Sequence, residues 1–155
     1  MKKIIPFIVS GILIACTACD PPSPTIPYGV YGTVTQREGN WMPPVNPQEA
    51  HEFPIQCEIA AFDSINIADL GNSLFQERIA ISDFNIREVT RTSSALNGFY
   101  MMKLPAGKYS IGVVDGDSIL THSMRVAGDG GWLMPLELFS NELREFNLVV
   151  DYAVY

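Results

Sequence analysis

The sequence has few of the residues from which catalytic and metal sites are usually built: two histidines, three cysteines and ten Lys and Arg residues among 155. It also contains no Gly-x-Ser-x-Gly turn, phosphate-binding loop or His-Glu-x-x-His helix. A zinc site would have to combine His51 and His122 with scattered carboxylates. We therefore predict no catalytic residue, no metal ligand and no cofactor.

The acidic residues offer weaker alternatives. Residues 115–117 (Asp-Gly-Asp) carry oxygen ligands that suit calcium, but the further ligands of a calcium loop do not follow, and Asp-Gly is common in β-turns. Asp83 with Glu88, or Glu137 with Glu142, could be the acid pair of a glycosidase, yet one sequence does not set the distance between two carboxylates. A hydrolase of this kind is the alternative from the enzyme class, and ordinary surface acids are the simpler interpretation.

The N-terminus has the pattern of a secretory signal. Residues 1–3 are basic and residues 4–13 form an apolar run, which is shorter than the roughly 20 residues needed to cross a bilayer. Leu-Ile-Ala-Cys, ending at Cys16, resembles the bacterial lipobox, in which the cysteine receives diacylglycerol. We therefore expect residues 1–15 to be a lipoprotein signal peptide and Cys16 to carry the lipid. Cleavage before Cys19, or an ordinary cleaved signal, are the alternatives.

Basic residues are scarce after the expected cleavage. Removal of residues 1–15 takes away Lys2 and Lys3 and leaves 8 basic against 17 acidic residues, a net charge of −9. Nucleic acids and anionic head groups attract basic patches, so this balance argues against both as partners. Membrane attachment would then depend on the acyl chains, and stable anchoring needs more than one.

The next segment predicts a tether. Residues 20–27 contain four prolines in eight positions, which favours an extended spacer over helix or strand. We expect a Pro-rich tether over residues 16–28 and one domain over residues 29–155. Cys19 in the tether could pair with Cys57 in an oxidising compartment, but a small buried side chain at Cys57 is the favoured interpretation.

Strand patterns dominate the domain. Alternating apolar residues or strong β-formers predict strands over residues 29–36, 54–62 and 85–92, and a closing strand of about ten residues, 146–155, lying centrally in a sheet. Residues 63–84 fit neither period and predict irregular structure with a short helical turn near 72–79. Many short strands and no long amphipathic helix predict an all-β sandwich of about seven strands.

Residues 96–114 predict a hairpin whose corner is Leu104-Pro105-Ala106-Gly107. We expect Gly107 to have a positive φ, which a Cβ would oppose. The predicted core face alternates on both sides of the corner: Tyr100, Met102, Leu104, Tyr109, Ile111 and Val113.

The same segment carries a family resemblance. Thr92, Gly98 and Tyr100, followed by Leu-Pro-Ala-Gly-Lys-Tyr at residues 104–109 and by Ile111, resemble the pattern of carboxypeptidase-regulatory-like domains. The resemblance implies a transthyretin-like or immunoglobulin-like β-sandwich that is usually a non-catalytic appendage, although a shared fold does not transfer function.

Further segments are similar to a lipoprotein branch of that family in Bacteroidetes-type bacteria: residues 32–35, 39–43 and 150–155. The likeness spans most of residues 29–155 and is poor over 63–91. It implies an outer-membrane-anchored lipoprotein of the cell envelope, facing the periplasm or the cell surface.

Two loops contain large apolar residues where polar ones are usual, with Trp41 and Met42 in one and Trp132, Leu133 and Met134 in the other. They could fold back over the ends of the sandwich, or form an exposed patch for a partner. We expect a non-enzymatic, lipid-anchored module with an interaction or structural accessory role, and Trp41, Met42, Trp132 and Met134 as its possible partner surface. A glycan- or ligand-binding lipoprotein is the alternative, and an envelope protein or a glycan is the expected partner.

Overall fold

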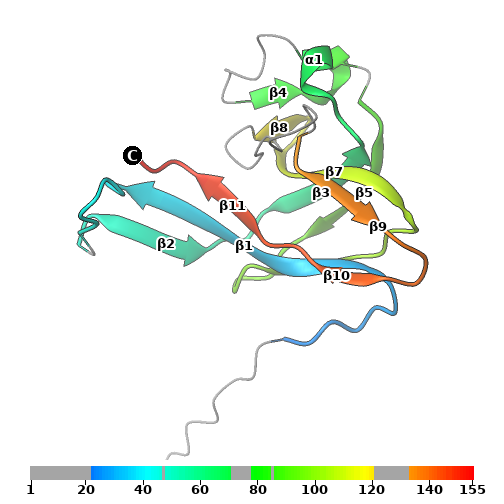
Figure 1. The fold of residues 1–155 in the computed structure, drawn as a ribbon, viewed down its shortest axis with the longest axis horizontal. Coiled ribbons are helices and arrows are strands. Elements are labelled where there is room, and N and C mark those ends of the chain that lie inside the picture. The colour runs from blue at the N-terminus through cyan, green and yellow to red at the C-terminus, as the bar shows by residue number, and fades with distance from the viewer. Residues whose placement is uncertain (1–21, 47, 71–77, 85, 121–132) are drawn as a thin grey trace, which may run out of the picture.

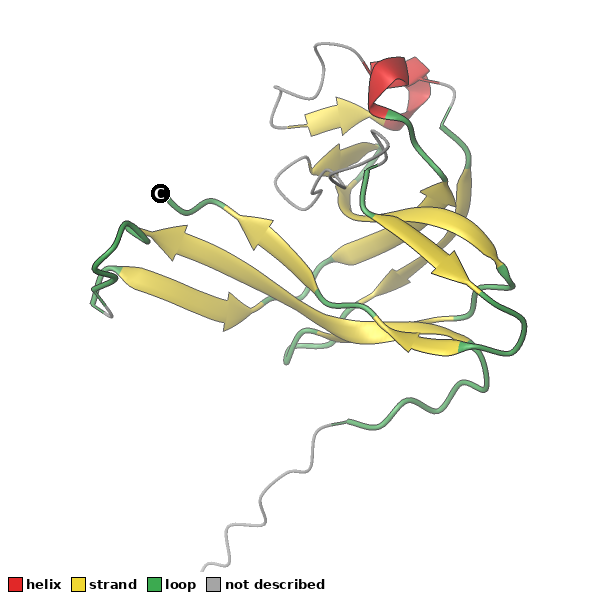
Figure 2. Cartoon of the chain, in the orientation of Figure 1, coloured by secondary structure: helices red, strands yellow, loops and turns green. Residues whose placement is uncertain are grey.

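The computed structural model describes residues 22–46, 48–70, 78–84, 86–120 and 133–155, and these form two packed β-sheets (Figure 1). Helix is confined to one corner of the molecule (Figure 2), in α1 (Ile67–Leu70) and η2 (Ile81–Phe84). The predicted all-β sandwich is therefore confirmed. The described chain is divided into eleven strands where the sequence predicts about seven, because several strands have only three or four residues.

The first sheet is built around one long strand, β1 (Gly29–Gly39). Two strands lie antiparallel along one edge of β1, and two lie parallel along its other edge. The antiparallel pair are β6 (Phe99–Met102) and β2 (Ala50–Pro54), and the parallel pair are β10 (Leu143–Glu145) and β11 (Leu148–Asp151). Each neighbour is short, so β1 alone runs the full length of this sheet.

The second sheet has β7 (Gly107–Asp115) at its centre, between β3 on one side and β8 and β9 on the other. β5 and β4 pair with β3 and β8 respectively. The bounds of these strands are β3 Glu58–Asp63, β4 Arg78–Ala80, β5 Glu88–Ser93, β8 Ser118–Leu120 and β9 Pro135–Leu138. β7 and β8 turn at Gly116 with a φ of 60°, so residues 115–117 form the predicted turn.

The main core lies between the two sheets. The six residues predicted to share a face around the 104–107 corner are all buried in one cluster with Val30, Val34, Leu148 and Val150. A second cluster under α1 and β4 centres on Phe62, Ile79 and Leu133. The alternation of apolar residues therefore predicted the buried face correctly.

The predicted hairpin over residues 96–114 is wrong. β6 pairs with β1 in the first sheet, whereas β7 pairs with β3 in the second, so residues 103–106 carry the chain from one sheet to the other. A hairpin and such a crossing have the same alternation, because in both cases the two strands direct matching side chains into one core. Pairing partners decide between them, and these are distant in sequence.

The predicted strand over residues 54–62 is also divided. Its first residue, Pro54, ends β2 in the first sheet, residues 55–57 cross between the sheets, and the remainder lies in β3 of the second sheet. The Ser94 hydroxyl holds this crossing, because it donates to the Ile55 carbonyl and accepts from the Cys57 amide, both at 2.9 Å. Ile59 and Ala61 are fully buried, and Ile55 and Cys57 are partly buried against the same core.

The closing strand is shorter than predicted and is not central. β11 has four residues and, in the described part of the chain, pairs only with β1, in parallel. Leu148 and Val150 are buried as expected, whereas Tyr152 and Val154 are exposed by 44% and 57%. The alternation continues beyond β11, but the second sheet no longer covers it there.

Further assignments differ from the sequence prediction. β2, β4, β9 and β10 were not predicted, because they are short and carry few β-branched residues. The short helix lies at Ile67–Leu70, and the segment near 72–79 where one was expected lies mostly outside the described residues.

Gly107 does not have the predicted positive φ. A Cβ at this position would lie 2.9 Å from the hydroxyl of Tyr109, which folds back and donates to the Pro105 carbonyl at 3.0 Å. A side chain at this position would therefore press on the tyrosine ring, and backbone strain plays no part.

We still expect Gly107→Val to lower the free energy of unfolding, by about 1–3 kcal/mol, because the added side chain displaces Tyr109. Urea unfolding of the purified protein measures the change. In a Tyr109→Leu background the hydroxyl is gone, so the glycine substitution should cost less there; an equal cost in both backgrounds would contradict the assigned contact.

One tyrosine joins three segments of the first sheet. Tyr100 of β6 lies opposite Gly32 of β1, and its hydroxyl donates to the Phe146 carbonyl, between β10 and β11, at 2.5 Å. The tyrosine can cross β1 because Gly32 has no side chain: a Cβ there would lie 2.1 Å from the same carbonyl oxygen. Burial raises the pKa of the Tyr100 hydroxyl, so it keeps its proton and remains a donor to a higher pH than an exposed tyrosine does.

Candidate functional site

The far half of β1 forms, with β2, a two-stranded ribbon (residues 35–54) that projects beyond the second sheet (Figure 1). The C-terminal residues extend it, since the amide of Trp41 donates to the Val154 carbonyl at 2.8 Å and the amide of Val154 donates to the Gly39 carbonyl at 2.9 Å. Because the ribbon extends past the edge of the second sheet (Figure 1), most of it is not covered by the sandwich, and four of the five residues of β2 are exposed.

The outer face of the ribbon, opposite to the core side, carries a polar and aromatic cluster. The Arg37 Nε lies 2.8 Å from Glu52 Oε2, and the Arg37 guanidinium lies 5.0 Å from the centre of the Trp41 ring. The hydrogen bond from Arg37 lowers the pKa of Glu52, so the pair stays charged to a lower pH than a free glutamate would allow. Beside it, the Tyr155 hydroxyl donates to Asp151 at 2.7 Å.

Exposed apolar side chains concentrate on the ribbon and the C-terminal residues. Of the nine large apolar residues that are exposed in the described chain, six lie here, with exposed fractions from 39% to 64%: Met42, Val45, Phe53, Tyr152, Val154 and Tyr155. The other three are scattered, at Tyr28, Leu96 and Phe139. Phe53 lies on the core-facing side of the ribbon and Tyr155 on its outer side, so the exposed apolar residues surround the ribbon, and apolar exposure gathered in one region is a candidate interaction surface.

The predicted partner residues fall in different environments. Met42 is 47% exposed at the ribbon tip, and Trp41 is partly buried, with its indole N–H donating to the Glu38 carbonyl at 3.0 Å. Met134 packs partly against the main core and Leu133 is 1% exposed. Figure 1 shows the start of β9, beside Met134, well away from the ribbon tip. Trp132 and the predicted lipid site Cys16 lie outside the described residues, so the joint patch and the lipid site stay predictions.

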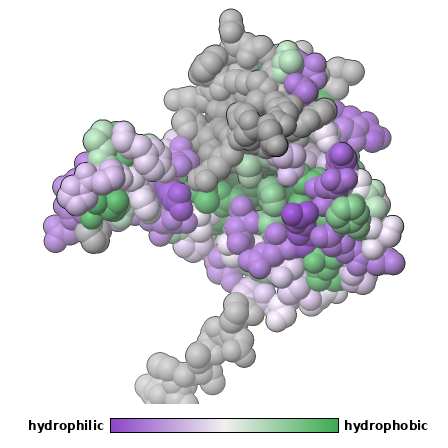
Figure 3. Space-filling model, viewed as in Figure 1, coloured by the Kyte–Doolittle hydropathy of each residue, from purple (hydrophilic) through white to green (hydrophobic). Residues whose placement is uncertain are grey.

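A cleft opens at the base of the ribbon, where the two sheets diverge. It has a volume of about 340 Å³ and is lined on opposite sides by Val150 of β11 and Val113 of β7. Figure 3 shows hydrophobic surface in this region. Cys57 lines the cleft as a free thiol whose pKa is raised by burial. Its predicted alternative partner, Cys19, lies outside the described residues.

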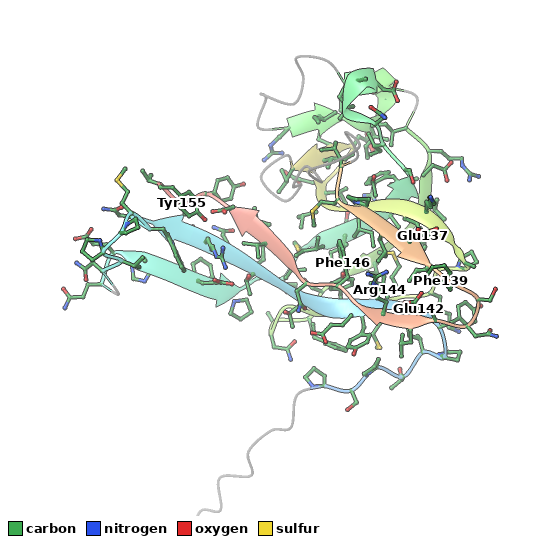
Figure 4. All side chains as sticks on the ribbon, in the orientation of Figure 1. Glu137, Phe139, Glu142, Arg144, Phe146 and Tyr155 are labelled. Carbon is green, nitrogen blue, oxygen red and sulfur yellow. The ribbon has the colours of Figure 1, made fainter. Side chains whose placement is uncertain are left out.

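A second cavity, of about 390 Å³, lies where β9 and β10 approach each other at the side of the sandwich. It is lined by Ser64, Lys108, Pro135, Leu136, Glu137 and Arg144. The Arg144 guanidinium donates from β10 to the Glu137 carbonyl of β9 at 2.9 Å. This hydrogen bond links the two sheets, and Figure 4 shows both side chains on one face of the molecule.

The described residues offer neither a metal-binding cluster nor a membrane-spanning helix. No three His, Cys, Asp or Glu side chains among them lie close enough together to hold a metal ion. No helix within the described ranges is long and apolar enough to span a bilayer.

Comparisons with known proteins give little guidance. No protein-family model matches the sequence, and no curated protein matches it. Among solved structures, the Bacillus anthracis TIE protein is similar with a TM-score of 0.34 and 12% identity, over 80% of this chain and 17% of that chain. This chain thus spans less than a fifth of that protein, and so distant a likeness carries no argument about function.

Sequence reasoning missed most of the residues that define these surfaces. Arg37, Glu52 and Tyr155 meet only because β2 and the C-terminal residues flank β1 on opposite edges. The exposed Tyr152 and Val154 continue a core alternation, so the sequence pattern placed them inside. For Arg144 the sequence carried no signal, because its place beside the Glu137 carbonyl depends on the two sheets coming together.

Proposed function

We propose that this protein is a non-enzymatic, lipid-anchored module of the cell envelope that binds a partner protein through its ribbon. The observation that carries the proposal is the concentration of exposed apolar side chains on the ribbon and C-terminal residues. Desolvation of such side chains is a main source of association energy, with aromatic residues as frequent anchors. The lipid on Cys16 and the outer-membrane location rest on the lipobox resemblance.

We further propose a relationship to carboxypeptidase-regulatory-like domains. Its support is the Leu-Pro-Ala-Gly-Lys-Tyr segment, in which Tyr109 closes over Gly107 and the chain passes between sheets. This relationship agrees with an accessory role and does not by itself name a partner.

A photo-reactive amino acid at position 42 tests the ribbon. Placed in the full chain in intact cells, it should form a discrete higher-mass protein adduct, because Met42 lies at the exposed tip. Val45→Glu in the same chain should reduce the adduct about tenfold by placing a charge in the interface. Immunoblots of the cross-linked membranes measure both.

Leu96 provides the matched control, since it is 82% exposed and lies outside the ribbon. The same photo-reactive residue at position 96 should give no discrete adduct. Equal adducts from both positions, or none from position 42, would argue against the ribbon as the binding surface.

A glycan is the second candidate, and the outer-face cluster favours it. Arg37 and Glu52 offer charged hydrogen-bonding groups beside the aromatic rings of Trp41 and Tyr155. Periodate cleaves vicinal diols of sugars and leaves a polypeptide chain intact. An adduct whose added mass is lost after periodate would therefore support the glycan, and one whose added mass is unchanged after periodate would support a protein partner.

A further inference from the structure

The cavity between β9 and β10 has an unusual charge for this chain. The full sequence carries a net charge of −7. Of the three charged residues that line the cavity, Lys108 and Arg144 are positive and Glu137 is negative, so the lining has a net charge of +1. A local cationic site in an acidic protein favours a ligand of opposite charge.

Arg144 is the residue that sets this charge. Among the arginines that the structure describes, Arg37, Arg78, Arg87 and Arg91 each form an ion pair with a carboxylate, and Arg144 does not. Within the same described ranges its hydrogen-bond partner is the Glu137 carbonyl, which uses one of the five guanidinium N–H groups. The remaining donors suit a planar carboxylate, which a guanidinium can bind in a bidentate manner.

The position of Arg144 is fixed by the fold. It lies opposite Val30 in the parallel pairing of β10 with β1. Val30 is fully buried, so both side chains project from the core-facing side of the sheet. At the open side of the sandwich this direction leads to β9, where the hydrogen bond to the Glu137 carbonyl holds the guanidinium. Figure 3 shows hydrophilic side chains gathered over β9 and β10 on this face.

The other lining residues indicate what accompanies the carboxylate. Lys108 and Glu137 lie opposite each other in the β7–β9 pairing, with Lys108 Nζ 3.7 Å from Glu137 Oε1, which is too long for a direct hydrogen bond. A carboxylate offers about four acceptor sites, so the Glu137 side chain can accept hydrogen bonds from ligand hydroxyl groups beside its ion pair with Lys108, and the Ser64 hydroxyl can also accept. Pro135 adds an apolar surface against which a sugar ring can pack.

We propose that this cavity binds an acidic saccharide, with the carboxylate of a uronate residue on Arg144 and ring hydroxyls on Glu137 and Ser64. The volume of about 390 Å³ lies in the range of small-ligand sites. Each uronate residue carries a single planar carboxylate, which the Arg144 guanidinium can bind in a bidentate manner. The cavity is formed by strands other than those of the ribbon, so a failed test of one proposal leaves the other unaffected.

Calorimetric titration of the full chain in detergent tests this site with trigalacturonate and its methyl ester. The two probes have the same sugar rings and differ in charge, so the ester should bind at least about tenfold more weakly. Arg144→Gln should weaken trigalacturonate binding by a similar factor. Arg78→Gln removes the same charge from an exposed arginine outside the cavity, and should change the affinity less than twofold.

Thermal melts of each variant separate lost binding from lost folding, and Lys108→Gln offers a second substitution in the cavity if Arg144→Gln is unstable. Equal affinities for acid and ester, or an unchanged affinity in Arg144→Gln, would overturn the proposal. So would tighter binding of inorganic phosphate, which would indicate a phosphate site, or of N-acetylalanine, which would indicate a peptide carboxylate. Absence of heat with trigalacturonate at millimolar concentration would also overturn it.

Discussion

Gly32→Ala is expected to lower the free energy of unfolding by about 3 kcal/mol, a large effect for a single added methyl group. The new Cβ would lie 2.1 Å from the Phe146 carbonyl oxygen, so either β1 or the segment between β10 and β11 has to move. Such movement also disturbs the hydrogen bond that this carbonyl accepts from Tyr100. Urea unfolding at constant temperature measures the loss.

Two comparisons show whether the close approach is the cause. Gly116→Ala adds the same methyl group at a turn where nothing lies within 4 Å of the new Cβ, and should cost about 1 kcal/mol through its positive φ alone. Tyr100→Phe should cost about 1–2 kcal/mol. The double variant with Gly32→Ala should cost less than the sum, because both substitutions act through the Phe146 carbonyl. Full additivity would contradict that coupling.

Cys16→Ser is expected to abolish lipid labelling, because the hydroxyl does not replace the thiol that accepts the diacylglycerol. Cells that produce the full chain are fed a clickable palmitate, and the immunoprecipitated protein is examined by gel fluorescence. The Cys16→Ser chain should also either retain its uncleaved signal peptide or be recovered outside the membrane fraction. Without the lipid it has no firm anchor, because an apolar run of this length does not span a bilayer.

Cys19→Ser is the matched control and should retain the full label. Label that persists on Cys16→Ser and disappears from Cys19→Ser would move the anchor to Cys19. Label on neither wild-type chain nor variants would contradict lipid attachment altogether.

The sequence predicted buried faces better than it predicted strand partners. Tyr100, Met102, Tyr109 and Ile111 are all buried, as their alternation indicates. That alternation depends only on which side of a strand meets the core, and it is the same whether the next strand is a hairpin partner or lies across the sandwich. The two crossings at residues 55–57 and 103–106 were therefore invisible in the pattern.

Exposure at the ribbon could not be predicted for a related reason. Tyr152 continues the spacing of Leu148 and Val150, but the second sheet does not extend over it. Whether an apolar residue at the end of a strand is buried depends on the length of the opposite sheet, which is a tertiary property. Within the described residues, the lack of an ion pair at Arg144 is likewise a property of the assembled sheets, since the carboxylates of Glu142 and Glu145 accept from Phe139 and Asn147 instead.

The central strand of the first sheet also has a mechanical consequence. The N-terminal segment joins β1 at one end and the ribbon tip lies at the other (Figure 1), with eleven residues, or about 35 Å, between them. A tension applied between an anchored N-terminus and a partner held at the tip would act along β1. Neighbouring strands on both edges bond to β1 at right angles to that load, so their hydrogen bonds would resist it together in shear and would not peel one at a time.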